Sequence, residues 1–126
     1  MKQISTYLNF IKEKGRPLSD INSGSNEFAL TVDEALHALK LLAKSQIAVL
    51  GGDILSQKEH GKLIYAYQLW GNGEEYHFLN WCCDKKENED FDDYVKRSHL
   101  VAKESIKIAD DIAKHLGKKC YIVIVI

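Results

Sequence analysis

Side chains able to do chemistry are concentrated in the middle of the chain, and Asp53 is the first candidate. It follows the double glycine Gly51-Gly52, and glycines after a strand let a backbone approach a phosphate or a partner. A phosphate loop also needs a helix start and a lysine at fixed spacing, which the residues after Asp53 do not supply. Asp53 is therefore a candidate acid, base or hydrogen-bond acceptor. The competing interpretation is a turn or bulge in which Asp53 accepts hydrogen bonds from local amides.

The three cysteines and five histidines form no recognisable metal or thiol motif. Cys82 and Cys83 are adjacent and Cys120 is distant, so there is no CxxC, and neither HxxxH nor HExxH occurs. His77 and Cys82 alternate to opposite faces of the strand expected there. We therefore expect no metal, no cofactor and no catalytic residue. The odd cysteine count favours reduced thiols in a cytoplasmic protein.

Aromatic and acidic residues point to binding. Trp70 lies near a strand end, where an exposed tryptophan would form a protein-binding hot spot. Acidic residues then crowd into one short run: Asp84, Glu87, Glu89, Asp90, Asp92 and Asp93. One interpretation is a solvated linker followed by an acidic first helical turn, with Asp92–Lys96 and Asp93–Arg97 pairs. The other is a patch that captures a basic partner and accelerates its association.

Composition limits the class of protein. The chain has 126 residues, 45% of them hydrophobic. This length and composition suit one domain over residues 1–126 whose core needs no disulfide or metal ion to stabilise it. Its formal net charge is -1, and a dedicated nucleic-acid binder usually carries a strong basic excess. No apolar run approaches the roughly 20 residues of a membrane span. We expect neither nucleic acid nor membrane as a partner.

Three helices are predicted from apolar spacing and end signals. The first runs from Ile4 to about Gly15. The second starts at a capping box formed by Thr31 and Glu34 and ends near Lys44. The third and longest covers Asp90–Leu116 and carries a sustained apolar face that includes Phe91.

Four strands are predicted at 47–50, 63–70, 76–83 and 121–126. The double glycine would end the first strand or place a bulge in it. The second and third strands would pair as a hairpin through a turn at 71–73. The last strand is apolar on both faces, so we place it inside the sheet beside the first. The predicted fold is α+β, in the order α-α-β-β-β-α-β. It has one four-stranded, mostly antiparallel sheet packed by the long C-terminal helix and two N-terminal helices.

Three segments together carry a resemblance to a known family: FALTVDEALHALKLLAKSQIAVLGGDI, YAYQLW and YHFLNWCC, followed by the long helix. They resemble the immunity proteins of bacterial polymorphic toxin systems, in particular the family called immunity protein forty. The resemblance covers Phe28 to the C-terminus. Its distinctive pieces are the strand followed by Gly-Gly-Asp and the strands that end in tryptophan.

The resemblance implies a small cytoplasmic α+β protein that binds one cognate toxin and blocks it by steric and electrostatic occlusion, without catalysis. Many such toxins are basic nucleases, which suits the acidic run. The partner-binding residues that we assign on this basis are Asp53, Trp70, Asp84, Glu87, Glu89, Asp90, Asp92 and Asp93. Two alternatives stay open. One is a small enzyme or ligand-binding domain with a pocket near Asp53, His77 and Asn80, and the other is a homodimer joined through an exposed strand edge.

Overall fold

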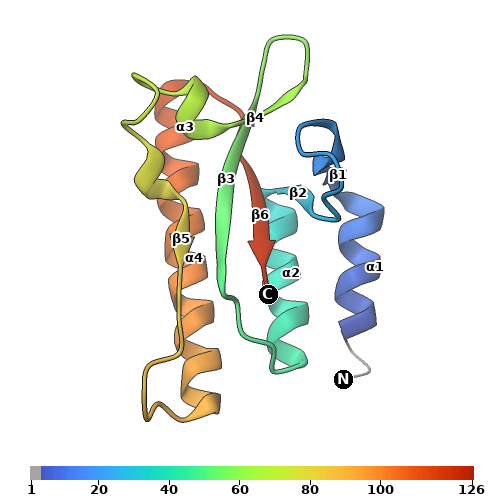
Figure 1. Ribbon diagram of the computed structural model, residues 1–126, viewed down its shortest axis with the longest axis vertical. Coiled ribbons are helices and arrows are strands. Elements are labelled where there is room, and N and C mark those ends of the chain that lie inside the picture. Colours follow the sequence, from blue (N-terminus) through green and yellow to red (C-terminus); the bar gives the residue numbers. More distant parts are fainter. Residues whose placement is uncertain (1–3) are drawn as a thin grey trace.

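The computed structural model describes residues 4–126 and contains helices on one side of a twisted sheet (Figure 1). The helices and 3-10 turns are α1 (Ile4–Lys14), η1 (Leu18–Asp20), α2 (Val32–Lys44), α3 (Ala66–Leu69), η2 (His77–Leu79) and α4 (Phe91–Leu116). The strands are β1 (Arg16–Pro17), β2 (Phe28–Thr31), β3 (Gly51–Gln57), β4 (Leu63–Tyr65), β5 (Trp81–Cys82) and β6 (Tyr121–Val125).

The strands form one antiparallel sheet. Its order is β1-β2-β6-β3-β4, and β5 pairs with the other end of β3. The predicted α+β class is confirmed, although the sheet has six strands rather than four. The apolar strand β6 lies inside the sheet, between β2 and β3, as its apolar faces predicted. The sequence pattern did not reveal β1 and β2, because they are only two and four residues long.

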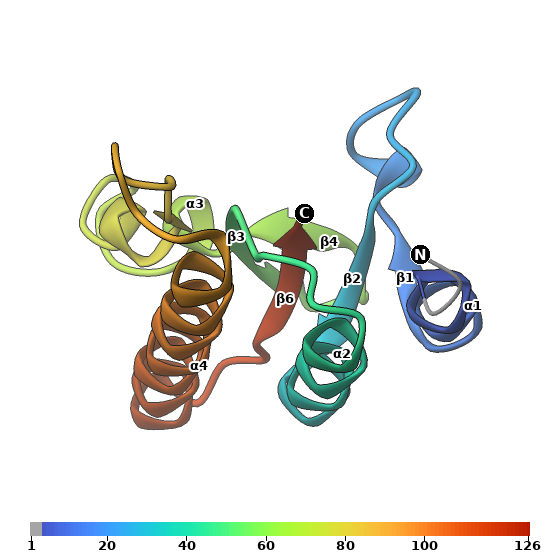
Figure 2. The ribbon, with the colours of Figure 1, turned by 90° about the horizontal axis from the view of Figure 1, so that it is seen from below.

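The two faces of the sheet are covered differently. Helices α2 and α4 lie side by side against one face, with α1 beside α2 (Figure 2). The main core lies between these helices and the sheet and includes Ile54, Ile106 and Ile122. No described helix crosses the opposite face, where only η1 and the chain after it contribute a small cluster around Leu18 and Val123. One face of an antiparallel sheet can remain in contact with water in this way.

The predicted ends of the two long helices are confirmed. The Thr31 hydroxyl accepts a hydrogen bond from the Glu34 amide, and the Glu34 carboxylate accepts one from the Thr31 amide. Asp90 caps α4, and Gly117 ends it in the left-handed conformation with φ 68°. Among the described helices, none is both long and apolar enough to cross a membrane.

The first predicted strand was placed too early in the chain. Residues 47–50 are not in a strand, and the Val49 amide donates to the Ser98 hydroxyl of α4 instead. The strand begins at Gly51, so the double glycine neither ends it nor forms the predicted bulge. A side chain on Gly52 would overlap the Trp81 indole, which packs directly on the strand. These glycines therefore provide space for β5 rather than an unusual backbone angle.

The predicted hairpin between 63–70 and 76–83 was wrong. Only Leu63–Tyr65 and Trp81–Cys82 form strands, and both pair with β3 instead of with each other. Between them α3 forms a single helical turn closed by a hydrogen bond from the Trp70 amide to the Ala66 carbonyl. The alternating pattern was misread because side chains of this segment enter the core at helical rather than strand spacing.

Candidate functional site

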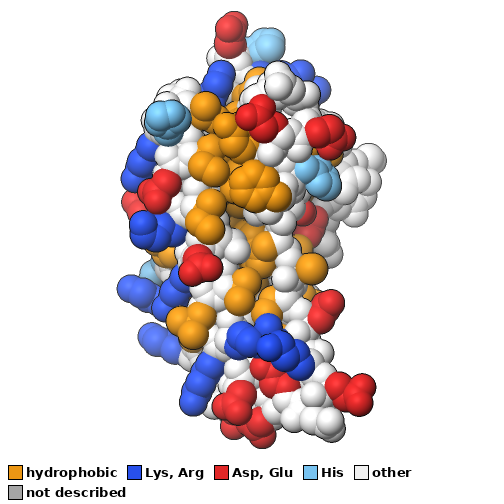
Figure 3. All heavy atoms as spheres, turned by 90° about the vertical axis from the view of Figure 1, so that its left-hand side faces the viewer, with side chains coloured by type: hydrophobic (Ala, Val, Ile, Leu, Met, Phe, Trp, Pro, Cys, Tyr) orange, Lys and Arg blue, Asp and Glu red, His pale blue; other side chains and the backbone are white. Residues whose placement is uncertain are grey.

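The acidic run lies at one end of the molecule, in the loop after β5 and the first turn of α4. Figure 3 shows acidic side chains gathered at that end, below an apolar stripe. Most of the predicted acidic residues are exposed: Asp84, Glu87, Asp90, Asp92 and Asp93. Glu89 is the exception, with a side chain only 13% exposed. The structure therefore brings the run together on one surface but separates Glu89 from the rest.

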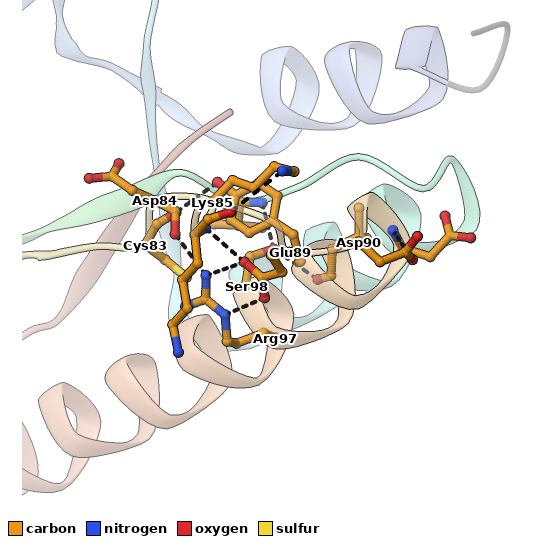
Figure 4. A network of polar contacts seen from close by, with 12 residues as sticks. Cys83, Asp84, Lys85, Glu89, Asp90, Arg97 and Ser98 are labelled. Carbon is orange, nitrogen blue, oxygen red and sulfur yellow. Dashed lines mark hydrogen bonds and ion pairs between the residues drawn. The ribbon is translucent and has the colours of Figure 1, made fainter.

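Glu89 forms an internal ion pair with Arg97 (Figure 4). The Arg97 Nε and a terminal nitrogen each donate to the carboxylate at 2.8 Å, and the Lys86 amide donates to it at 2.9 Å. These hydrogen bonds lower the pKa of Glu89 to about 2, and the pairing raises the pKa of Arg97. Glu89 is therefore occupied in holding the loop, which removes it from the partner-binding set predicted from the sequence.

Arg97 also holds the remainder of the loop. A terminal nitrogen donates to the Asp84 carbonyl at 2.7 Å, and the other lies 3.2 Å from the Cys83 sulfur. The guanidinium lies 5.6 Å from the centre of the Tyr94 ring, within cation-π range. The predicted pairing of Arg97 with Asp93 does not form, because Glu89 holds the guanidinium.

The exposed acids consequently have few internal partners. Within the described chain, the carboxylates of Asp84, Glu87, Asp92 and Asp93 form no ion pair, and the predicted Asp92–Lys96 pair is absent. The Asp90 carboxylate accepts a hydrogen bond from the Asp92 amide at 3.1 Å. Asp90, Asp92 and Asp93 also lie at the N-terminus of α4, where the positive end of the helix dipole favours negative charge.

An apolar anchor lies within the acidic surface. Phe91 is 53% exposed, although the sequence pattern assigned it to the buried face of the helix. A groove of about 540 Å³ opens nearby between the end of α2 and the first half of α4. Its lining includes Asp92, Val95 and Leu100. An exposed aromatic beside a partly apolar groove, with acids around it, has the composition of a protein-binding surface.

The start of α4 is anchored by hydrogen bonds to neighbouring segments. The Tyr94 hydroxyl donates to the Cys83 carbonyl at 2.7 Å. On the other side, the Ser98 hydroxyl accepts from the Val49 amide at 3.0 Å, and His99 Nε2 lies 2.8 Å from the Ile47 carbonyl. The carbonyl can only accept, so His99 donates through that nitrogen. The acidic surface is thus presented on a fixed support.

A second group of polar side chains lies on the sheet face that the helices leave open. Asp53 stands in the middle of β3 opposite Val123 of β6, and Glu27 immediately precedes β2. Partial burial raises the pKa of Asp53. Partial burial and the negative charge of Asp53 raise the pKa of Glu27. The sequence singled out Asp53 but not Glu27, which carries no local signal because its neighbour arrives only through the sheet.

Two tyrosines and a histidine form a row of ring contacts that begins at Tyr65 of β4. The Tyr65 and Tyr67 ring centres are 6.0 Å apart, and the His77 ring lies 4.5 Å from Tyr67 in an edge-on arrangement. Burial raises the pKa of Tyr65, and the charges of Asp53 and Glu27 raise it further. Tyr65 is paired with Leu55, so its side chain shares the face on which Asp53 lies.

Two sequence assignments change once the fold is known. Trp70 is 1% exposed and packs edge-on against Tyr76, so it belongs to the core and not to a contact surface. The Asn80 carboxamide oxygen accepts a hydrogen bond from the Ile54 amide at 2.8 Å. This bond satisfies the β3 backbone between the segments that pair with β5 and β4. Neither Asp53, His77 nor Asn80 lines any of the five main hollows of the described surface.

Comparison with known proteins assigns a family to most of the chain. The family model described as Immunity protein 40 matches residues 17–126. No curated protein and no solved structure gave a match. Within residues 4–126 no three histidine, cysteine or acidic side chains are grouped so that they could hold a metal ion.

Proposed function

Because the chain belongs to the immunity protein 40 family, we propose that it binds a cognate protein toxin and neutralises it by covering the toxin's functional surface. The family match over residues 17–126 is the observation that carries this proposal. Binding alone accounts for the effect, so the mechanism requires no catalytic residue. The cytoplasmic location expected from the sequence forms part of the same proposal.

The acidic end of α4 is the surface that we assign to the first encounter. Its side chains are Asp84, Glu87, Asp90, Asp92 and Asp93. Charges act over about 8 Å at physiological ionic strength, so acids clustered this closely reinforce one another. The formal net charge of the whole chain is only -1, and attraction of a basic toxin therefore depends on this local cluster.

Phe91 is the side chain that we expect to hold the toxin after the encounter. Exposed aromatic residues dominate the affinity of many protein interfaces when polar groups around them exclude water. The groove between α2 and α4 begins at Asp92, the residue after Phe91, and leaves space for an apolar side chain of the toxin. Charge would then set how fast the complex forms, and Phe91 how slowly it separates.

Co-expression with the protein encoded immediately upstream tests the proposal. We expect a stable complex on purification through a tag on this chain, and restored growth of cells that the upstream protein otherwise kills. Failure of both complex formation and growth rescue would overturn the proposal for that pair.

Charge reversal then tests the surface. The variant Asp84→Lys/Glu87→Lys changes two exposed loop carboxylates that lie outside the helix, so α4 keeps its acidic first turn. We expect the association rate to fall by roughly tenfold at low salt, with less loss at high salt. The control Glu13→Lys/Glu59→Lys makes the same change in charge at exposed positions elsewhere. Equal effects of both variants would show that the position of the charges is unimportant.

A further inference from the structure

The open face of the sheet carries negative charge that nothing in the described chain neutralises. Asp53 and Glu27 are both partly buried, and neither carboxylate forms an ion pair or accepts a hydrogen bond among the described residues. They also repel each other, as the raised pKa of Glu27 shows. A carboxylate that loses water normally gains hydrogen bonds or an opposite charge in return.

The arginine at the edge of this face is already engaged. Arg16 of β1 donates to the Gln57 carboxamide at 2.8 Å and to the Gly61 carbonyl at 2.5 Å. Its guanidinium also lies over the Tyr121 ring, 5.2 Å from the ring centre. Arg16 is therefore committed to the far end of β3. Arg16 thus lies on this face of the sheet but forms no ion pair with Asp53 or Glu27.

Aromatic rings frame the two carboxylates. Tyr65 pairs with Leu55 of β3, two residues from Asp53 and on the same face of the sheet, and Tyr67 lies next to Tyr65. Phenol rings supply flat faces on which a guanidinium can stack, while carboxylates accept its N–H groups. The combination of acceptors and rings is thus complementary to an arginine side chain. No α-helix covers this face, and only η1 and the chain after it pack on part of it (Figure 2).

We propose that this sheet face, formed by Asp53, Glu27, Tyr65 and Tyr67, receives an arginine side chain of the toxin. The proposal rests on the proposed toxin-binding function and adds a second contact on a different side of the molecule. The arginine would lie against the tyrosine rings and donate to the two carboxylates. Contacts at both the acidic end of α4 and the sheet face would require a toxin that wraps over the edge of the sheet.

Neutral variants of the same shape test the contact. Asp53→Asn and Glu27→Gln keep the size of each side chain and remove the charge, and neither breaks an internal ion pair. The control Glu104→Gln makes the same change at an exposed position on α4, which packs against the opposite face. The probe is the purified upstream protein, and its dissociation constant is measured by calorimetry for each variant.

We expect the double variant Asp53→Asn/Glu27→Gln to bind at least tenfold more weakly, mainly through faster dissociation, while Glu104→Gln binds like the wild type. Wild-type affinity in a double variant that is folded, with a native circular dichroism spectrum and a cooperative melting transition, would overturn the sheet-face contact and leave the proposed function intact. Absence of binding by the wild type would instead overturn the proposed function. Ultracentrifugation of the chain alone tests whether a second copy of this chain occupies the face instead. A dimer that the double variant dissociates would assign this face to the second copy and overturn the toxin contact.

Discussion

The packing of the Trp81 indole on Gly52 predicts the effect of a side chain at that position. Gly52 is buried in β3, and the Trp81 indole occupies the space that a side chain there would need. Gly52→Ala would therefore force the indole or the strand to move. Overpacking typically costs about 1–3 kcal/mol, and overlap with three carbons of the indole places this site in the upper half of that range, at about 2–3 kcal/mol. The lower entropy of the unfolded alanine chain offsets about 0.5–1 kcal/mol of this.

The net expectation is a loss of about 1–2 kcal/mol in the free energy of unfolding. A chain of 126 residues has an unfolding entropy near the melting point of about 0.26 kcal/mol/K. The melting temperature should therefore fall by about 4–8 °C. Thermal unfolding followed by circular dichroism measures the shift, and urea unfolding gives the free energy independently.

A double-mutant cycle with Trp81→Leu identifies the cause. Once the indole is removed, Gly52→Ala should cost nothing or become slightly stabilising, which gives a coupling of about 1–3 kcal/mol between the two positions. A Gly52→Ala protein as stable as the wild type would refute the reasoning. So would an equal loss in the Trp81→Leu background, since that would point to the backbone of Gly52 instead of its neighbour.

Three further predictions concern a helix cap and two sets of carboxylates. Thr31→Ala removes the capping box of α2 and should lower the free energy of unfolding by about 1 kcal/mol in urea unfolding; an unchanged midpoint would contradict the cap's role. The pKa values of Asp53 and Glu27 are raised in the folded state, so their contribution to stability is most favourable below about pH 4, the unfolded range, and declines as the pH rises through the raised values. The variants Asp53→Asn and Glu27→Gln should thus be more stable than the wild type at pH 7, and lower melting temperatures would refute this. The pKa of Glu89 is lowered to about 2, so its stabilisation is complete above about pH 4.5 and lost as the pH falls toward 2. In an Arg97→Gln protein, carboxyl NMR titration should find that the Glu89 pKa rises toward its ordinary value, while the Lys86 amide still holds it somewhat below that value. A pKa that stays near 2 would show that Arg97 is not the cause.

The helices were predictable because their signals are local. Thr31 and Glu34 stand three residues apart and cap the same turn, and Gly117 ends α4 beside its last apolar residue. The interior position of β6 was equally predictable, because a strand with apolar side chains on both faces is favoured inside a sheet rather than at its edge. These features depend on residues that are close in the chain, so the sequence alone contains the information.

The strands and the binding surfaces were harder to predict because they depend on distant neighbours. The start of β3 at Gly51 is set by Trp81, which arrives 29 residues later in the chain and packs over Gly52. Glu27 becomes a neighbour of Asp53 only after β6 has inserted between their strands. Phe91 has the spacing of a core residue but lies where α4 extends past the sheet, and this exposes its ring.

A titration of toxin activity tests the central claim most directly. The activity of the purified upstream protein is measured in a cell-free reaction while this chain is added in increasing amounts. The account predicts that activity falls linearly to zero at equal molar amounts, with no loss of inhibition when the chain is recovered from the complex and used again. Full toxin activity in the presence of excess chain would contradict the claim, and so would inactivation by far less than one equivalent, which would indicate turnover.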